Sequence, residues 1–339
     1  MITVSPFALG LRRPFITAKG TTTHRTGWLV RANVDDAIGL GEAAPFPGLC
    51  TDDPERITRD IERIGQITDP PPSLAELDAW VGSHASTAVV RHALGAALLD
   101  CMAQRRGQPI ARLLNPRARN DVPLNHLYID DDALLHATLL GCQTVKLKVG
   151  VKSLDDDVAT VQRIREIAGP GVDIRLDANG AWNEATAEAA IDAFVPLGVR
   201  TIEDPVHPTQ FAAMARLRGR GIDIAADESL TSMAVLHGLL AANAVDTIVI
   251  KPMRVGTPMA AMDIIRLADQ YNVATIVTTT IDGAVGRMMA LHLAAAAPTT
   301  RLRACGLNTG GWLATDHGVT PDMTGSHVDT PTLPGLGLR

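Results

Sequence analysis

The sequence contains few aromatic residues and no excess of positive charge. Only 3% of its 339 residues are Phe, Trp or Tyr, and the formal net charge at pH 7 is −6. Proteins that bind nucleic acid usually present a basic surface and aromatic side chains for base stacking, so we expect no nucleic-acid partner. The four cysteines lie far apart without a CxxC pair, which predicts reduced thiols in a cytoplasmic protein.

Sequence signals for membranes, secretion and several common enzyme classes are also missing. No run of 18 or more apolar residues occurs, and the N-terminus lacks the basic-then-apolar order of a signal peptide, so we expect no membrane partner. No GxSxG, Walker A or GxGxxG fingerprint stands in a suitable context, and no histidines pair as HxH or HExxH. These absences argue against a serine nucleophile, a phosphate loop, a dinucleotide site and a histidine-ligated metal.

Two kinds of periodicity divide the chain. The first 45 residues contain three short strand-like runs, and helical patterns follow from about 54 to 106. From about 122, eight short apolar or β-branched runs alternate with helical segments, which predicts an α/β protein with a TIM-like (β/α)8 barrel, modified to (β/α)7β at the last helix. The predicted domains are an α+β cap at 1–110, a barrel at 118–315, and a tail at 316–339 that packs back on the cap.

Three acidic residues end three successive strand-like runs of this barrel. They are Asp177 in VDIRLD, Glu203 in RTIED and Asp227 in IDIAAD. The carboxyl ends of barrel strands meet at the active-site mouth, and three carboxylates there suit a hard cation such as Mg²⁺, or Mn²⁺ in its place. Taken singly, each acid also fits a turn or a helix cap. Their shared position at strand ends is what favours a metal site.

Basic residues accompany the acidic series. Lys146 and Lys148 share one face of the run before Asp177, and Lys251 ends a later run. A lysine inside a barrel is costly unless it acts on something, so amines on both sides of a metal site indicate chemistry on a carboxylate substrate. Surface lysines that snorkel at strand ends are the alternative. Arg175 shares the Asp177 face, where it either orients a carboxylate or forms a structural ion pair.

Polar and glycine-rich segments follow the last two runs. Thr278-Thr279-Thr280 ends the seventh run, and a segment containing Gly306 follows the eighth. This corner binds anions through backbone N–H groups in many barrels, and a glycine-rich loop of no special role is the alternative.

Five motifs resemble those of the enolase superfamily, in its muconate-lactonizing-enzyme branch. They are KLK at 146–148, DAN at 177–179, EDP at 203–205, ADES at 226–229 and IKP at 250–252. The resemblance covers nearly the whole chain. It implies a divalent cation on the three acids, an enediolate formed from a small carboxylate substrate, and Lys148 and Lys251 as catalytic residues. The residues expected to contact the substrate or support the ligands are Lys146, Arg175, Asn179, Glu228, Thr278, Thr280 and Gly306.

Within this branch the sequence is most similar to the o-succinylbenzoate synthases, the lyases of menaquinone biosynthesis. GEAAPFPG at 41–48, TTTIDGAVG at 278–286 and CGLNTGGWLATD at 305–316 resemble their segments, with Thr for Ser and Asp282 for Glu as departures. The implied reaction dehydrates 2-succinyl-6-hydroxy-2,4-cyclohexadiene-1-carboxylate to 2-succinylbenzoate, with Lys148 as base and then acid and Lys251 stabilising the intermediate.

Several alternatives to the synthase stay open. N-succinylamino acid racemases, dipeptide epimerases and muconate cycloisomerases belong to the same branch, although the acidic pair that dipeptide epimerases usually carry at strand eight is missing here. A metal-binding barrel without turnover is an alternative from another class. The resemblance also implies that the segment Gly20–His24 is a mobile lid loop over the barrel mouth, against which a plain hairpin loop must be weighed. The oligomeric state is left open.

Overall fold

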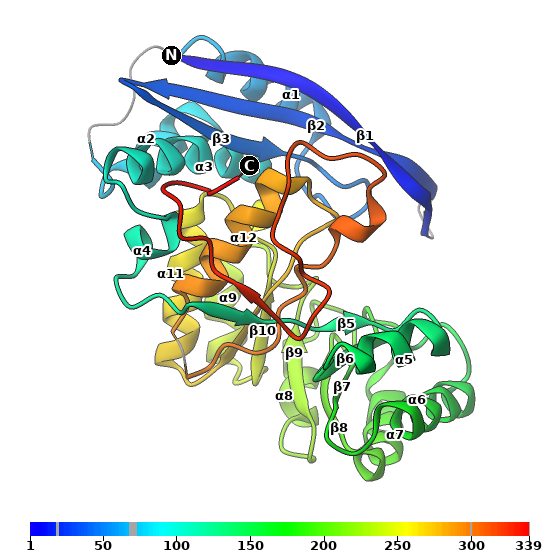
Figure 1. The fold of residues 1–339 in the computed structure, drawn as a ribbon. Helices are drawn as coiled ribbons and strands as arrows, with labels where there is room; N and C mark the ends of the chain where they lie inside the picture. The colour runs from blue at the N-terminus through cyan, green and yellow to red at the C-terminus, as the bar shows by residue number, and fades with distance from the viewer. Residues whose placement is uncertain (18–19, 68–72, 299, 339) are drawn as a thin grey trace.

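The computed structural model describes residues 1–17, 20–67, 73–298 and 300–338. It consists of an antiparallel sheet with helices beneath it, set on a barrel of parallel strands surrounded by helices (Figure 1). Both labelled ends of the chain lie beside the cap sheet. The structure therefore confirms the predicted α/β barrel with an N-terminal α+β cap.

The cap sheet has the strand order β1-β2-β3 and packs closely on one helix. Gly39 and Gly41 of the third strand face the backbone of that helix, where an added Cβ would lie 1.9 and 1.8 Å from the carbonyl oxygens of Ala97 and Ala93. Glycine is thus required for this close approach. The cap elements are β1 (Ile2–Thr17), β2 (Gly20–Val34), β3 (Ala37–Ala43), α1 (Pro54–Ile64), α2 (Leu77–His84), α3 (Ala88–Arg105) and α4 (Ile110–Leu114).

The segment Gly20–His24 is not a loop, so this prediction was wrong. It forms the first part of β2 and pairs with β1, with Thr22 opposite Phe15 and His24 opposite Gly10. Three consecutive threonines favour an extended strand, because β-branched side chains fit the pleated backbone. Residues 18 and 19, which connect the two strands, lie outside the described part of the chain.

Seven parallel strands form most of the barrel wall, in the order β11-β10-β9-β8-β7-β6-β5. The eighth predicted run closes the ring through isolated bridges, Thr275 to Leu302, Thr278 to Gly306 and Leu124 to Cys305. The strands are β5 (His126–Leu127), β6 (Thr144–Lys148), β7 (Asp173–Asp177), β8 (Val199–Glu203), β9 (Asp223–Ala226), β10 (Thr247–Ile250) and β11 (Ala274–Val277).

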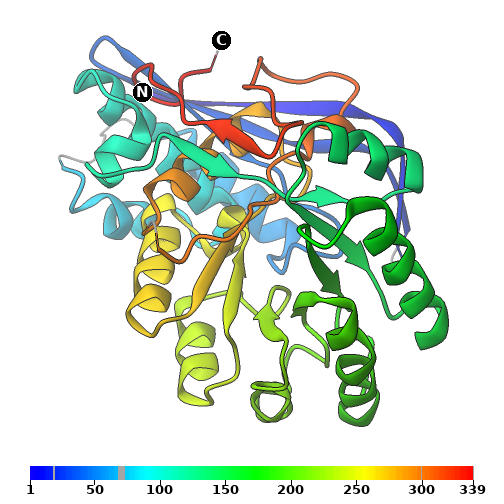
Figure 2. The same cartoon turned by 60° about the horizontal axis from the view of Figure 1, so that its bottom comes forward.

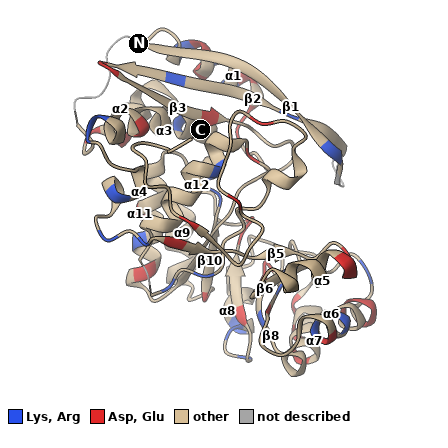
Figure 3. Ribbon diagram, viewed as in Figure 1, with Lys and Arg blue, Asp and Glu red and all other residues tan. Residues whose placement is uncertain are grey.

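Helices cover the outside of the barrel, as seen with the lower end brought forward in Figure 2. They are α5 (Asp131–Leu139), α6 (Leu154–Ala168), α7 (Glu184–Phe194), α8 (Phe211–Leu217), α9 (Met233–Ala241), α10 (Pro252–Val255), α11 (Pro258–Gln270) and α12 (Ala284–Ala296). Acidic and basic residues are interspersed over these outer helices (Figure 3), and pairs such as Arg163–Asp131 and Arg216–Glu184 join neighbours. Such exposed pairs add little to stability.

The helix α12 is buried along its whole length. It packs between the barrel strand β11 and the cap elements β3 and α4, which explains its Ala-, Leu- and Met-rich sequence. No helix in the described ranges is long and apolar enough to cross a membrane.

The C-terminal tail contacts both parts of the molecule. Its strand β12 (His327–Asp329) pairs with β4 (Asp121–Pro123) beside the barrel. Further on, the Leu336 N–H donates to the Asp100 carboxylate of α3 at 2.8 Å.

Candidate metal centre and active site

The three predicted acids meet at the carboxyl ends of neighbouring strands. Asp177 ends β7, Glu203 ends β8 in register with it, and Asp227 directly follows β9. One carboxylate oxygen from each lies within 4.8 Å of the other two, and the residues are 4%, 0% and 2% exposed. Because the strands are parallel and in register, acids spaced about 25 residues apart in the sequence lie together in one buried cluster.

Two lysines contact these carboxylates. The Lys146 ammonium lies 2.8 Å from Asp177 and also contacts Glu203, whereas the Lys251 ammonium pairs with Asp227. Burial works against the charged form of Lys146, but the neighbouring carboxylates hold its pKa well above the usual value. Of the two lysines on β6, Lys146 therefore neutralises part of the negative charge of the three carboxylates.

The chemistry of the acids fits a bound cation. Burial raises the pKa of Glu203 to about 7, Lys146 opposes this rise, and Asp177 and Asp227 add to it. The Oε1 atom of Glu203 is buried and has no hydrogen-bond partner in the described residues. A divalent ion would supply both the missing partner and the missing positive charge, and three carboxylate oxygens are ligands that Mg²⁺ accepts.

Metal affinity should therefore depend on pH below about 7. Protonated Glu203 must lose its proton before it can bind a cation, so apparent affinity should fall by about tenfold per pH unit below the pKa and level off above it. Titration calorimetry with Mn²⁺ at pH 5.5, 6.5 and 8, in two buffers of different ionisation enthalpy, would measure the affinity and the released proton. An affinity that does not change between pH 5.5 and 8 would contradict this assignment.

The two predicted catalytic lysines lie on opposite sides of the acids in the strand order. Lys148 ends β6 and is exposed, and Lys251 follows β10 and is 9% exposed. Strands β7, β8 and β9, which carry the acids, lie between them. No ion pair of Lys148 occurs within the described ranges, so its ammonium is not committed to the acids.

Three further polar residues support the ligands. The Asn179 amide donates to Glu228 at 3.1 Å, and its backbone N–H donates to Asp177. Asp204 is fully buried and accepts hydrogen bonds from the backbone N–H groups of Asp227 and Glu228. It therefore fixes the turn that carries the third ligand. The motif analysis quoted Asp204 within EDP and assigned it no role, although its position beside a ligand was a usable signal.

Arg175, Thr278, Thr280 and Gly306 all lie within the barrel or at its mouth. Arg175 approaches Glu203 at 3.8 Å and donates to the Ala304 carbonyl. The Thr278 hydroxyl donates to the Gly306 carbonyl at 2.9 Å, and the Thr280 hydroxyl donates to Asp282. The threonines thus tie the seventh strand end to its neighbours.

Gly306 allows the close approach that completes the ring. A Cβ at this position would lie 2.5 Å from the Thr278 hydroxyl, so Gly306→Ala should lower the free energy of unfolding by about 1–3 kcal/mol. Denaturant unfolding would measure this loss. Gly311→Ala, where an added Cβ meets nothing within 4 Å, is the matched control. Adding Thr278→Ala should restore part of the loss, and equal stability of the two single variants would refute the packing argument.

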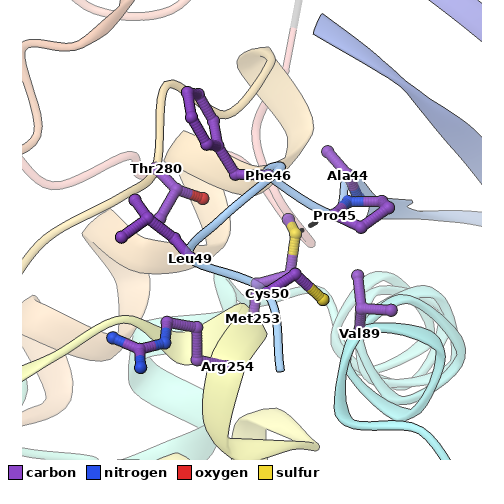
Figure 4. A pocket seen from close by; sticks show the side chains of 9 residues that line it. All are labelled: Ala44, Pro45, Phe46, Leu49, Cys50, Val89, Met253, Arg254 and Thr280. Carbon is purple, nitrogen blue, oxygen red and sulfur yellow. Dashed lines mark hydrogen bonds between the residues drawn. The ribbon is translucent and has the colours of Figure 1, made fainter. Parts of the chain in front are cut away.

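A pocket lies between the cap and the barrel mouth. Figure 4 shows cap residues Phe46 and Leu49 beside Met253, Arg254 and Thr280 of the barrel. The remaining lining residues are Ala44, Pro45, Cys50 and Val89. The guanidinium of Arg254 donates through Nη2 to the Glu228 carbonyl, whereas its buried Nε and Nη1 have no hydrogen-bond partner in the described chain. The lining is therefore mostly apolar, with Thr280 and one cation, and it encloses only about 10 Å³, room for a single water.

Buried charges join the cap to this mouth. The carboxylate of Glu42 accepts from the N–H groups of Gly283 and Gly286, at the start of α12. Arg25 donates to the carbonyls of Ala44, Pro45 and Ile281. Ile281 has a φ of 60°, a strained value for a β-branched residue. The motif analysis quoted Glu42 within GEAAPFPG without a role and did not single out Arg25. Their barrel partners Gly283, Gly286 and Ile281 are over 200 residues away.

Comparisons with known proteins agree with this geometry. Residues 132–339 match the family model described as enolase C-terminal domain-like. An L-Ala-D/L-Glu epimerase of Bacillus subtilis is 30% identical over 99% of this chain and 95% of its own length. A chloromuconate cycloisomerase of Pseudomonas putida is 28% identical over 96% of this chain and 92% of its own length. An o-succinylbenzoate synthase of Desulfotalea psychrophila is 28% identical over 81% of this chain and 84% of its own length. The substrate-liganded structure of the Bacillus subtilis epimerase superimposes with a TM-score of 0.89 over 100% of this chain and 98% of that one, at 28% identity.

Proposed function

Because the chain belongs to the enolase superfamily, in its muconate-lactonizing-enzyme branch, we propose that it is an Mg²⁺-dependent o-succinylbenzoate synthase. Its substrate is then 2-succinyl-6-hydroxy-2,4-cyclohexadiene-1-carboxylate, and the reaction is a dehydration in menaquinone biosynthesis. The observation that carries the proposal is the buried cluster of three acids with Lys148 and Lys251 on either side of it in the strand order.

The three buried acids Asp177, Glu203 and Asp227 hold the cation in this proposal. When bound, it neutralises negative charge on the substrate carboxylate as the α-proton leaves. Lys146 and Arg175 orient the acids through the contacts described above.

Lys148 and Lys251 have different roles in this reaction. Lys148, at the open end of β6, takes the proton from the carbon next to the carboxylate. It then donates that proton to the ring hydroxyl, which leaves as water while the ring becomes aromatic. Lys251, held by Asp227 on the other side, stays protonated and stabilises the anion.

The electrostatics of the pocket favour a second anionic group on the substrate over an ammonium group. Arg254 gives the pocket lining a positive charge, which favours a carboxylate over an ammonium group. Asp316, the first acid after the eighth strand run, already pairs with Arg287 at 2.8 Å. It also accepts from the Ala284 N–H at the start of α12, so its carboxylate is committed. A succinyl carboxylate therefore fits better than the free amine of a dipeptide.

N-succinylamino acid racemase is the second candidate. Its substrates carry the same succinyl carboxylate, and its chemistry needs a base on each face of the α-carbon. The placement of Lys148 and Lys251 on either side of the acids suits this requirement equally well. The two activities are therefore distinguished by substrate.

The test is an absorbance assay of purified protein with Mg²⁺ and the cyclohexadiene carboxylate, beside panels of N-succinyl amino acids and of L-Ala-L-Glu-type dipeptides. We expect rapid, EDTA-sensitive loss of the diene band and no change in the dipeptides. Racemisation of the succinylated panel without loss of the diene band would replace the synthase by the racemase. Dipeptide epimerisation would overturn the pocket argument.

A further inference from the structure

A second cavity lies at the opposite end of the barrel from the metal centre. It has a volume of about 180 Å³ and is formed by the starts of the strands, including Thr144 of β6, Asp173 of β7 and Asp223 of β9. Asp173 precedes the metal ligand Asp177 by four residues, which is about 13 Å along a strand. The two sites thus lie at different levels of the same barrel, and Arg175 between them is common to both.

Small side chains explain why the barrel is hollow here. The middle of the interior is filled by the cluster of Ala225, Val249 and Ile276. Bulky branched residues usually continue such layers to the base of a barrel. At the base of this barrel, Thr201, Gly221 and Ala304 line the wall instead, together with Thr144 and Ile174.

Three arginines line the cavity against two aspartates. Arg175, Arg200 and Arg303 give three positive charges, and Asp173 and Asp223 give two negative charges, so the lining carries a net charge of +1. Arg200 lies 3.4 Å from Asp173, and Arg303 lies 3.3 Å from Asp223. Each pair engages a single guanidinium nitrogen, and neither guanidinium has another hydrogen bond or ion pair in the described residues, so donors of both remain for a ligand.

The third arginine is buried and incompletely paired. Arg175 is 5% exposed, and its guanidinium bonds Asn125 and the Ala304 carbonyl through the two terminal nitrogens. Its Nε–H is buried without a hydrogen-bond partner in the described part of the chain. Because this atom is closed off from solvent, Arg175 adds positive charge behind the cavity wall and offers no direct donor through Nε.

We propose that the base of the barrel binds a small phosphate-type oxyanion, either inorganic phosphate or the phosphate group of a metabolite. Arg303 and Arg200 at the rim supply the charge-assisted donors, Arg175 on the wall adds positive charge, and the Thr144 and Thr201 positions leave the space. Arg175 also approaches Glu203, but the other lining residues have no role in the reaction at the mouth. Binding there stabilises the folded barrel, because the ligand is bound only when the strand starts are assembled.

The experiment is a titration of the full-length protein with inorganic phosphate, and separately with glycerol 3-phosphate, by thermal unfolding and by calorimetry at constant ionic strength. Saturable stabilisation is expected both with Mg²⁺ and with EDTA. Arg303→Gln and the double variant Arg200→Gln/Arg303→Gln should weaken the apparent affinity by about tenfold or more. Both rim arginines are largely exposed, so these variants should fold.

Arg301→Gln is the matched control. It removes one positive charge two residues from Arg303, from a guanidinium that bonds Asn272 outside the cavity, and it should bind phosphate normally. A stronger response to the ester than to phosphate identifies a metabolite as the ligand. The proposal is overturned if no saturable effect appears, if the effect requires Mg²⁺, or if Arg301→Gln weakens binding as much as Arg303→Gln.

Discussion

Replacement of Lys148 by alanine should lower turnover by about 10²–10⁴-fold, because the group that removes and returns the proton is lost. The affinity for Mg²⁺ should change little, since no ion pair between the Lys148 ammonium and the acids occurs in the described residues. Steady-state kinetics and a metal titration of the same preparation would measure both quantities. Lys152→Ala, which removes an exposed lysine just beyond β6, is the control and should be fully active.

Lys251 separates the two candidate reactions. Lys251→Ala should abolish either activity, because the buried lysine opposite Lys148 is removed and Asp227 loses its ion pair. Lys251→Arg keeps the charge and can therefore spare the synthase, whereas a racemase also needs this residue to exchange a proton. Full synthase turnover in Lys148→Ala would remove Lys148 from the mechanism.

The Glu203→Gln substitution should prevent metal binding and with it catalysis. The residue is fully buried between Asp177 and Asp227, and an amide offers a cation one neutral oxygen in place of a charged carboxylate. We expect the metal affinity to fall by about 100-fold or more, equivalent to about 2.8 kcal/mol. Calorimetric titration with Mn²⁺ would measure the loss, with Glu188→Gln on the outer surface as the control.

Stability distinguishes this ligand role from a structural role. The pKa of Glu203 is raised to about 7, so without metal the folded state binds an extra proton between the ordinary glutamate pKa and that value. Its contribution to stability therefore decreases as the pH rises through this range. At pH 8 without metal, Glu203→Gln should unfold at the same temperature as the parent protein or higher. A large loss of stability there would indicate that Glu203 mainly supports the fold.

Much of the candidate site was predictable because barrel topology is periodic. The βα spacing of Asp177, Glu203 and Asp227 places all three residues at one rim once the strands are parallel and in register. Lys146 and Lys148 share a face because successive side chains of a strand alternate. Which of them contacts the acids was not predictable, since this depends on their depth along the barrel axis. The structure places Lys146 inside and Lys148 at the rim.

The family resemblance was misleading at Gly20–His24, which it assigned to a lid loop although the three threonines favour a strand. Long pairing with β1 keeps this segment extended instead. The same limit applies to Arg25, whose carbonyl partner Ile281 is 256 residues away. The local sequence does not predict such contacts, because nothing near Arg25 indicates which distant residue the fold will bring next to it.

The barrel, the cap and the acidic series were predictable from the sequence alone, because these follow from repeating patterns and from residue types at equivalent strand ends. What surrounds them became clear only in the folded structure. It placed Arg254 in the wall between cap and barrel, committed Asp316 to Arg287, and left a polar hollow beneath Arg175. Such features depend on how side chains from distant segments fill or leave space, and this is set by packing in three dimensions.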